Sequence, residues 1–469
     1  MPFHIAPNGF VLTVSGMNAD TIAAIASPPG RGAVALIRIS GDHSLEIVRK
    51  IYRGCADLPP RSRFQHLGEI FDPQTGDVID QVLMTHFPAP HSFTGEEVVE
   101  IGCHGGMLVT KAILDALYQS GAEPAQPGAF SQRAFLNGKI DLTQAEAIMD
   151  LISAKTELAR RAANRQLRGG LGTEVESLRQ NLIGLIAQVE AWIDFPEDDI
   201  DTDSQSALLA RLDEILTRMD SLLATAEQGR FLREGVRTVI AGPPNAGKSS
   251  LLNLLLGFDR AIVNEAAGTT RDTIEEMINL NGFPIRLIDT AGIRDDGVSV
   301  EMEGILRSHN EIRQADLVLL VIDSSVSAEA LQSIPIPQDN TRVMKILNKS
   351  DLPTHPDWKE CHAESCTSIS CLTGSGKDKV SAAIASLLSG ETGAFATGDI
   401  VAINARHQHC LLTAESELAA ARHKITGSES PEFIAVDLRS SLDAIGEIVG
   451  KTDIDEILSE IFSTFCIGK

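Results

Sequence analysis

The chain has 469 residues, 43% of them hydrophobic and 22% charged, which is the composition of a globular protein with roughly three domains. Its formal net charge of −24 argues against a protein that coats nucleic acid through general electrostatic attraction, but it leaves room for a local basic patch. No apolar run is long enough to cross a membrane.

The N-terminus and the cysteines both bear on the cellular compartment. The residues before Met17 lack the basic start and the long apolar core of a secretory signal. They are either a weakly ordered extension or a stretch that precedes a natural start at Met17. The seven cysteines are scattered and show no zinc-finger spacing, which indicates free thiols. We therefore expect a cytoplasmic protein.

Residues 20–135 are predicted to mix short strands with helices. The apolar stretches 20–26 and 32–40 are expected to pair as strands, and 98–101 is a further strand. A helix is predicted over 107–117. This part of the chain is therefore expected to be an α/β domain.

From about residue 140 to 232 the apolar residues follow helical spacing, as at Leu178, Leu182, Leu185 and Val189. One of these helices carries a basic run, which is either a solvated face or a contact for RNA phosphates. Its members are Lys155, Arg160, Arg161, Arg165 and Arg168. The acidic stretch 194–203 is expected to be a solvated bend between two helices.

The strongest motif is Gly-Pro-Pro-Asn-Ala-Gly-Lys-Ser at 242–249, which fits the pattern Gly-x-x-x-x-Gly-Lys-Ser. A β-branched strand is predicted before it over 236–241, and an apolar helix after it over 250–256. Glycines let such a loop wrap phosphates, and backbone N–H groups at the helix N-terminus point at them. We expect Lys248 to reach the β- and γ-phosphates and the Ser249 hydroxyl to bind Mg²⁺.

Three further segments follow in the order expected of a nucleotide-binding domain. A strand at 285–288 leads into Asp-Thr-Ala-Gly, whose Asp289 suits control of Mg²⁺. A strand at 343–347 leads into Asn-Lys-Ser-Asp, and its last residue, Asp351, can accept two N–H donors from guanine but would stay unpaired beside adenine. The loop 370–372 is predicted to lie behind the base. These segments indicate GTP rather than ATP.

After about residue 390 the chain is predicted to return to helices. The last helix carries a buried stripe of apolar residues, namely Ile454, Ile457, Leu458, Ile461, Phe462 and Phe465. The simplest architecture packs the last helices against those of 140–232. The nucleotide domain is then an insertion between two halves of one helical domain.

Taken together, these features resemble the MnmE/TrmE family of tRNA-modification GTPases over nearly the whole chain from Asp20. The stretches that carry the resemblance are 28–32 with 38–41, 92–96, 134–139, 289–294 and the terminal Phe-Cys-Ile-Gly-Lys at 465–469. The resemblance implies an α/β plus α fold. It comprises an N-terminal α/β tetrahydrofolate-binding and dimerisation domain (1–136), a discontinuous helical domain (137–232 and 392–469) and an inserted Ras-like P-loop GTPase domain (233–391).

The resemblance also implies a reaction. A homodimer would work on tRNA with an MnmG/GidA-type flavoprotein, in a heterotetramer or larger complex. It would add a carboxymethylaminomethyl-type group to C5 of wobble uridine 34. A 5-formyl- or methylene-tetrahydrofolate would supply the carbon.

For GTP hydrolysis, Ras-type enzymes place a Gln after Asp-Thr-Ala-Gly to orient the attacking water, but this chain has Ile293, which cannot hydrogen-bond. By resemblance Glu301 acts on the water, although by sequence alone it is one acid among several, such as Glu303. The resemblance further implies that K⁺ replaces a missing positive charge, held by Asn245, Asn264, Ala266 and Thr269. Thr270 would join Ser249 as a ligand of Mg²⁺.

The residues expected to contact GTP are Asn245, Ala246, Gly247, Lys248, Ser249, Ser250, Asn264, Glu265, Ala266, Ala267, Gly268, Thr269, Thr270, Asp289, Thr290, Ala291, Gly292, Asn348, Lys349, Asp351, Ser370, Cys371 and Leu372. By resemblance the folate contacts are Arg38, Glu100, Lys139 and Lys469. Cations suit the glutamate tail of a folate, and a carboxylate suits the donors of its pterin. Each of these residues, taken singly, could instead be a structural ion-pair member.

Cys466 lies at the same C-terminal tail and is assigned a catalytic role beside the folate. The alternative is a small buried residue that closes the last helix.

A second function stays open as well: a GTP-driven ribosome-assembly switch without covalent RNA chemistry. Such a switch would need the GTP motifs but not Arg38, Glu100, Lys139 or the Cys-Ile-Gly-Lys end.

Overall fold

The computed structural model describes residues 20–54, 60–194, 202–257, 275–288, 311–328, 341–358, 366–389, 401–451, 458 and 461–468. Its contacts divide the chain into two compact units. The first comprises Met1–Met149 with Gly446–Lys469, and the second comprises Asp150–Ile445. The domain boundaries expected at 136, 232 and 391 stay predictions.

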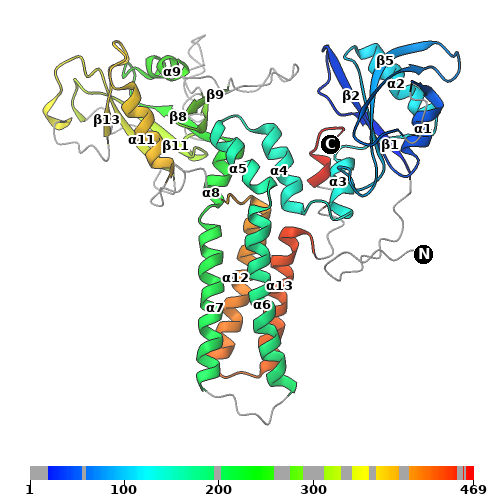
Figure 1. Cartoon of the computed structure of the whole chain (residues 1–469). Coiled ribbons are helices and arrows are strands. Elements are labelled where there is room, and N and C mark those ends of the chain that lie inside the picture. Colours follow the sequence, from blue (N-terminus) through cyan, green and yellow to red (C-terminus); the bar gives the residue numbers. More distant parts are fainter. Residues whose placement is uncertain are drawn as a thin grey trace, which may run out of the picture. The chain divides into compact units, whose positions relative to one another are not determined.

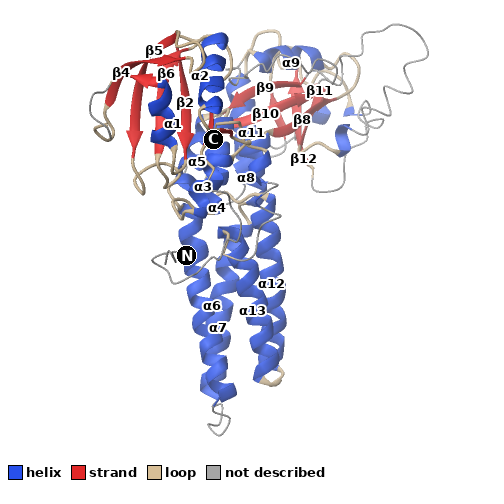
Figure 2. Cartoon of the chain, turned by 90° about the vertical axis from the view of Figure 1, so that its right-hand side faces the viewer, coloured by secondary structure: helices blue, strands red, loops and turns tan. Residues whose placement is uncertain are grey.

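The first unit is built on a seven-stranded sheet with the strand order β3-β4-β5-β6-β2-β1-β7 (Figure 2). The strands are β1 (Ile22–Ile25), β2 (Val34–Ser40), β3 (Tyr52–Arg53), β4 (Gln65–Phe71), β5 (Val78–Phe87), β6 (Val98–His104) and β7 (Glu123–Pro124). The expected pairing of the first two apolar stretches is confirmed, because β1 and β2 run antiparallel side by side. The strand expected at 98–101 is the first part of β6.

Helices α1 (Ser44–Ile51) and α2 (Met107–Gln119) pack on one face of this sheet (Figure 1). Ile37 of β2 is buried in the same apolar cluster as Ile47 of α1 and Ile113 of α2. Successive side chains of a strand point to opposite faces. Arg38 therefore lies on the face opposite to these two helices, which decides where its charge can act.

The C-terminal residues also belong to the first unit. Leu458, Phe462 and Phe465 are buried against Leu142 and Ala145 of α4 (Leu142–Ser153), which follows α3 (Ala129–Leu136). The apolar stripe expected on the last helix is thus buried in its described part. Its other predicted members, at 454 and 457, lie outside the described residues.

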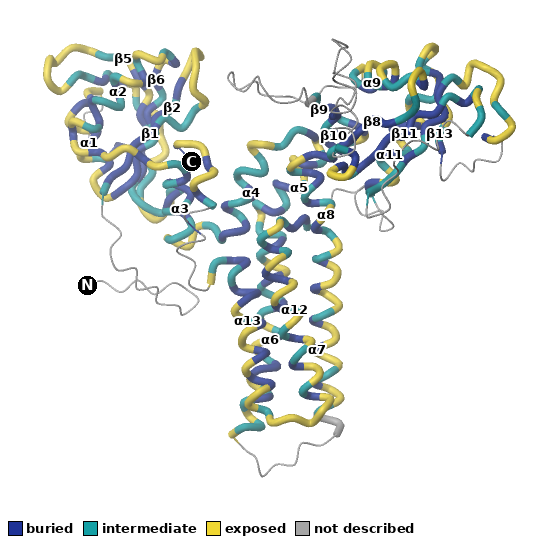
Figure 3. Tube along the Cα trace, turned by 180° about the vertical axis from the view of Figure 1, so that it is seen from behind, coloured by how far each residue is buried: buried dark blue, intermediate teal, exposed yellow. Residues whose placement is uncertain are grey.

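The second unit contains a set of helices, of which the long ones run side by side as a bundle (Figure 1). Its helices are α5 (Glu157–Leu167), α6 (Gly170–Asp194), α7 (Thr202–Leu223), α8 (Ala226–Glu234), α12 (Ala405–Thr426) and α13 (Pro431–Val449). Buried positions recur at helical spacing along them (Figure 3). Arg439 of α13 pairs with Glu190 of α6 at 2.5 Å. The expected packing of the last helices on those of 140–232 is confirmed, while most of the acidic bend at 194–203 lies outside the described residues.

The other part of this unit is a six-stranded sheet with the order β13-β12-β11-β8-β10-β9. The strands are β8 (Val236–Ala241), β9 (Glu275–Leu280), β10 (Phe283–Ile288), β11 (Leu317–Asp323), β12 (Arg342–Asn348) and β13 (Cys366–Ser368). The helices of this part are α9 (Lys248–Leu256), the short 3-10 helix η2 (Pro356–Trp358) and α11 (Lys377–Ser389). All neighbouring strands are parallel except β9 and β10. The predicted α/β plus α fold class, with an inserted P-loop domain, is confirmed.

Parallel pairing explains why the motif loops meet. The six residues from Leu317 to Ile322 of β11 are all buried, as expected for a central strand of a parallel sheet. The carboxyl ends of such strands share one edge, where open α/β sheets bind ligands. The phosphate loop follows β8 and Asn348 ends β12, so both lie at that edge.

The cysteines differ from expectation at one position. Among the described residues Cys103, Cys371, Cys410 and Cys466 form no disulfide bond. Cys366 is disulfide-bonded, so the expectation of free thiols throughout is wrong there. In the described part of the chain, no helix combines the length and the apolar character that a membrane span requires.

Candidate functional sites

The phosphate loop is a tight turn from β8 into α9 that depends on two glycines. Gly242 has φ of +150°, and an added Cβ would collide with the carbonyl oxygen of Val321. Gly247 has φ of +99°, and an added Cβ would collide with Nδ2 of Asn348. Side chains at either position would therefore push the loop away from its neighbours. The loop can keep its backbone N–H groups close to a ligand only because both residues are glycine.

Lys248 begins α9 and folds back over the loop. Its Nζ donates hydrogen bonds to the carbonyl oxygens of Gly242 and Pro243, each at 3.0 Å. Burial lowers the pKa of this ammonium group. A partly desolvated cation attracts a phosphate more strongly than one in bulk water does. Lys248 is thus held where a phosphate oxygen can replace the loop carbonyls.

Asn348 joins three loops that are far apart in the sequence. Its side chain is buried; Nδ2 donates to Ala246 O at 2.8 Å, and Oδ1 accepts from Cys371 N at 3.0 Å. Beside it, Asp351 Oδ1 accepts a hydrogen bond from Ser370 Oγ at 2.6 Å. These contacts hold the phosphate loop, the Asn-Lys-Ser-Asp loop and the loop 370–372 together.

The three loops enclose an open cleft of about 750 Å³. It is lined by Asn245, Gly247, Lys248, Ser249, Ser250, Asn348, Lys349, Asp351, Leu352, Cys371 and Leu372. Ten of these eleven were expected to contact GTP, and Leu352 was not. Ala246 and Ser370 are buried behind the cleft, where they receive or give the hydrogen bonds described above. The structure therefore gathers every described residue of the predicted GTP set in one place.

Asp323 was missed by sequence reasoning. It ends β11, and its Oδ2 lies 2.5 Å from Nζ of Lys349, which has φ of +62°. Although desolvation opposes the shift, hydrogen bonds from Lys349 and Ser325 lower the pKa of Asp323 overall. The ion pair orients the loop that carries Asp351. An acid at the end of an otherwise apolar strand was the available signal.

Part of the predicted set lies outside the described residues: Asn264, Glu265, Ala266, Ala267, Gly268, Thr269, Thr270, Asp289, Thr290, Ala291, Gly292, Glu301 and Lys469. Their roles stay predictions. Within the described residues, no group of three or more His, Cys, Asp or Glu side chains is arranged to hold a metal ion.

A second cluster surrounds Arg38 on the sheet of the first unit. Arg38 and Glu100 are direct partners in the β2–β6 register, and Nη2 of Arg38 lies 2.8 Å from Oε1 of Glu100. The guanidinium Cζ also lies 5.2 Å from the ring centroid of Phe93 and 5.7 Å from that of Phe130. The two charged side chains are 14% and 21% exposed, so a ligand can still reach them.

Lys139 contacts the loop that carries Phe93, which is part of the Arg38 cluster. Its Nζ donates to Pro90 O at 2.9 Å, and a Cβ on Gly95 would lie 3.3 Å from its Cδ. The loop 90–95 therefore links Lys139 to the Arg38 cluster. Sequence reasoning missed the two phenylalanines as site residues, although Phe93 stands in one of the stretches that carry the family resemblance.

The C-terminal residues pack closely at two glycines, one against β1 and one at the start of α3. Gly468 is buried with φ of +94°, and a Cβ there would collide with Ile25 O at the end of β1. Gly128 has φ of +68°, and a Cβ there would lie 2.6 Å from Phe462 O. Ala24 of β1 is the register partner of Arg38. The tail therefore meets β1 next to the Arg38 cluster, and Cys466, two residues earlier, is exposed.

The basic run of the helical part lies on and around α5. Arg160 and Arg161 both pair with Glu157, at 2.6 and 3.0 Å. Their hydrogen bonds, first from Arg160 and then from Arg161, lower the pKa of Glu157 to about 2. One carboxylate thus offsets part of the positive charge. Contact of this helix with RNA stays a prediction.

Comparisons with known proteins give the family. The model of the "MnmE helical domain" matches residues 142–466, and that of the "GTP-binding protein TrmE N-terminus" matches residues 21–139. A protein of Akkermansia muciniphila named tRNA modification GTPase MnmE is 51% identical and aligns with 96% of this chain and 99% of its own length. The protein of the same name from Natranaerobius thermophilus is 43% identical and aligns with 97% and 100%, respectively.

Among solved structures, the G domain of the T. maritima FeoB iron transporter is 26% identical, with a TM-score of 0.22. The match covers 32% of this chain and 96% of that chain. The family models and the close relatives together confirm the resemblance inferred from the sequence: the chain belongs to the MnmE family of tRNA modification GTPases.

Proposed function

We propose that this chain is a cytoplasmic GTPase, dependent on Mg²⁺ and K⁺, that works in tRNA modification as a homodimer with an MnmG/GidA-type flavoprotein. The complex adds a carboxymethylaminomethyl-type group to C5 of wobble uridine 34, with the carbon drawn from 5-formyl- or methylene-tetrahydrofolate. The observation that supports GTP binding most directly is the joining of three cleft loops by Asn348.

Guanine is selected by Asp351. Its carboxylate accepts N–H donors from the guanine edge, and the hydrogen bond from Ser370 at 2.6 Å holds it in one orientation. Adenine has no matching pair of donors, so it would leave the carboxylate unpaired. Asp351 is exposed in this structure, so the discrimination, on the order of 10⁴, depends on the bound base covering the carboxylate.

The phosphates are held at the start of α9. Lys248 gives up its two carbonyl partners and binds phosphate oxygens, while Ser249 and Thr270 hold Mg²⁺ and Asp289 supports it. Asn245, Asn264, Ala266 and Thr269 hold K⁺. Both ions supply positive charge to the phosphates when bound.

Water is oriented by Glu301 in this proposal. Position 293 is isoleucine and has no side-chain donor or acceptor, so another residue must position the nucleophile. Glu301 takes that role by the family resemblance.

The folate is bound at the Arg38 cluster. Arg38, Lys139 and Lys469 provide cations for the glutamate tail, and Glu100 provides an acceptor for pterin N–H donors. The contact of the tail with β1 supports a position of Cys466 beside this ligand. A ribosome-assembly switch, the second candidate, would need the nucleotide cleft but neither this cluster nor the tail contacts.

The test compares tRNA from cells that lack the protein with tRNA from cells complemented by wild type, Arg38→Ala, Cys466→Ser or the tail control Thr464→Ala. We expect loss of modified wobble uridine by mass spectrometry without the protein and with the first two variants, and recovery with the control. Purified Cys466→Ser should still hydrolyse GTP, because its substitution alters no residue of the cleft. Normal wobble uridine together with immature ribosomal subunits in the deletion strain would establish the assembly switch instead.

A further inference from the structure

The turn between β9 and β10 is a tight hairpin whose tip touches α5. Asn281 and Gly282 have φ of +49° and +95°, and Asn279 Oδ1 accepts a hydrogen bond from Gly282 N at 2.9 Å. Two positive φ angles suit an Asn-Gly turn of two residues. A Cβ added to Gly282 would lie 3.3 Å from Cβ of Leu158, so the tip rests against this side chain.

Helix α5 shares the apolar core of the nucleotide sheet. Ala159 is buried in the same cluster as Ile278 of β9 and Phe283 of β10, and Leu158 packs against that cluster. In the sequence α5 belongs to the helical part, far from the nucleotide motifs. Through this core, a change in the position of the hairpin alters the surface on which α5 rests.

Helix α8, by contrast, is fastened to the sheet. Arg230 pairs with Asp316 at 2.6 Å, and Glu227 pairs with Arg342 at 2.6 Å. Phe231 of α8 is fully buried in the core of the sheet. Two ion pairs to residues outside the hairpin and a buried aromatic ring are expected to hold α8 more firmly than α5, even though Gly235, which ends α8, lies against Pro284 and Arg286 of β10.

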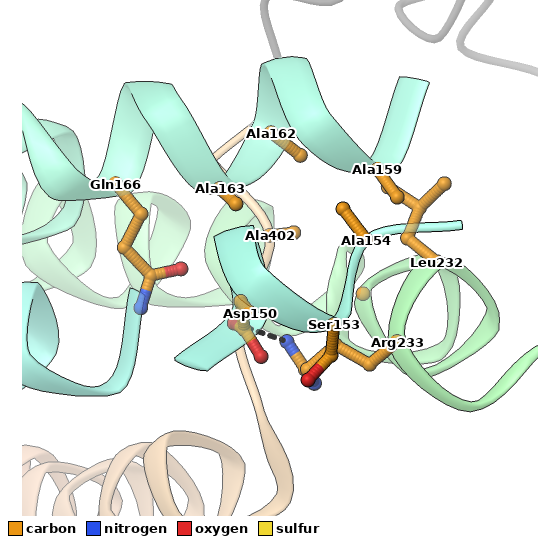
Figure 4. Close-up of a pocket in the computed structure, with 11 residues that line it drawn as sticks. Asp150, Ser153, Ala154, Ala159, Ala162, Ala163, Gln166, Leu232, Arg233 and Ala402 are labelled. Atoms are coloured by element: carbon orange, nitrogen blue, oxygen red, sulfur yellow. Dashed lines mark ion pairs between the residues drawn. The ribbon is translucent and has the colours of Figure 1, made fainter. Parts of the chain in front are cut away.

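Packing is loose where α5 faces α8. A cavity of about 40 Å³ lies between α4, α5 and α8 (Figure 4). Most of its lining is small: Ala154, Ala159, Ala162, Ala163, Gly229 and Ala402. Asp150 and Arg233 also line it, with N and O atoms 4.0 Å apart. Small side chains interdigitate little, and atoms that border a void lack packing contacts on that side. A shift of α5 relative to α8 therefore breaks few van der Waals contacts.

Both strands of the hairpin are continuous with nucleotide motifs. β9 begins at Glu275, shortly after Thr269 and Thr270, the expected ligands of K⁺ and Mg²⁺, and β10 ends at Ile288, directly before Asp289. We infer that the β9–β10 hairpin couples the nucleotide state to α5: its tip acts on Leu158, and the alanine-lined cavity gives α5 room to move against α8. The basic helix thereby changes position with the nucleotide. This inference rests on the proposed GTP binding but not on the folate or tRNA chemistry.

The test is hydrogen exchange of residues 157–167 in the full chain loaded with GDP or with a non-hydrolysable GTP analogue. We expect wild-type α5 to exchange at different rates in the two states. Leu158→Ala should lessen this difference, because it removes the Cγ and Cδ2 atoms that face the hairpin tip and leaves only Cβ, and Leu158→Met should keep it. The matched control is Leu209→Ala, a half-buried leucine of α7, which should also keep it.

A second variant examines the cavity. Ala163→Val adds two carbon atoms at the void and should lessen the difference by wedging α5 against α8. Nucleotide affinity is measured for every variant, so that loss of coupling is separated from loss of binding. Equal exchange of wild-type α5 in both nucleotide states, or an unchanged difference in Leu158→Ala and Ala163→Val, would overturn the inference. A wild-type chain that binds neither nucleotide would overturn the proposed function together with it.

Discussion

Replacing Asn348 by alanine tests the two hydrogen bonds that connect the loops of the nucleotide cleft. The substitution removes the 2.8 Å hydrogen bond to Ala246 O and the 3.0 Å hydrogen bond from Cys371 N. Each neutral hydrogen bond contributes about 1 kcal/mol net, so the pair contributes about 2 kcal/mol to the arrangement of the loops. That energy corresponds to about 30-fold weaker nucleotide binding.

The assay is fluorescence titration of a labelled guanine nucleotide, with Asn404→Ala as the control. Asn404 caps α12 by accepting a hydrogen bond from His407 N at 2.8 Å, and it does not line the nucleotide cleft. Asn404→Ala should lower the free energy of unfolding by about 1 kcal/mol and leave nucleotide affinity unchanged. If Asn348→Ala binds nucleotide as tightly as wild type does, the three loops do not need this side chain and the reasoning is refuted.

The two sites give three further predictions. Asp351→Asn should weaken GTP binding and improve binding of xanthosine triphosphate, whose edge presents an acceptor there; equal GTP affinity in both proteins would remove the assignment of Asp351. Asn245→Ala should bind GTP but lose K⁺-stimulated hydrolysis, by a factor of about 10²–10³; identical wild-type rates in NaCl and KCl would argue against a K⁺ site. Gly128→Ala should lower the free energy of unfolding in urea by about 1–3 kcal/mol more than Gly76→Ala. Gly76 has a similar φ of +75° but open space around it, whereas Gly128 abuts Phe462, so equal losses would mean that the tail contact is unimportant.

The sequence alone was sufficient for features whose parts are close together in the chain. The phosphate loop combines a β-branched strand, two glycines and a helix start within a short stretch, and local propensity decides each of them. The alternation of buried and half-exposed residues in β2 and the apolar stripe of the last helix are equally local signals. Since these patterns depend only on residue type and backbone periodicity, the amino-acid sequence is enough to predict the fold class and the motif residues.

Tertiary structure alone decided the contacts between distant segments. Asn348 meets Ala246 and Cys371 because parallel strands bring their carboxyl ends to one edge, and no local pattern encodes that meeting. The aromatic rings around Arg38 and the contact of Gly468 with β1 likewise depend on how loops cross the sheet. The position of α5 shows this most clearly: its periodicity predicts a helix, but burial of Ala159 in the core of the nucleotide sheet is a property of packing. A helix pattern specifies an apolar face, and only the assembled fold determines what that face covers.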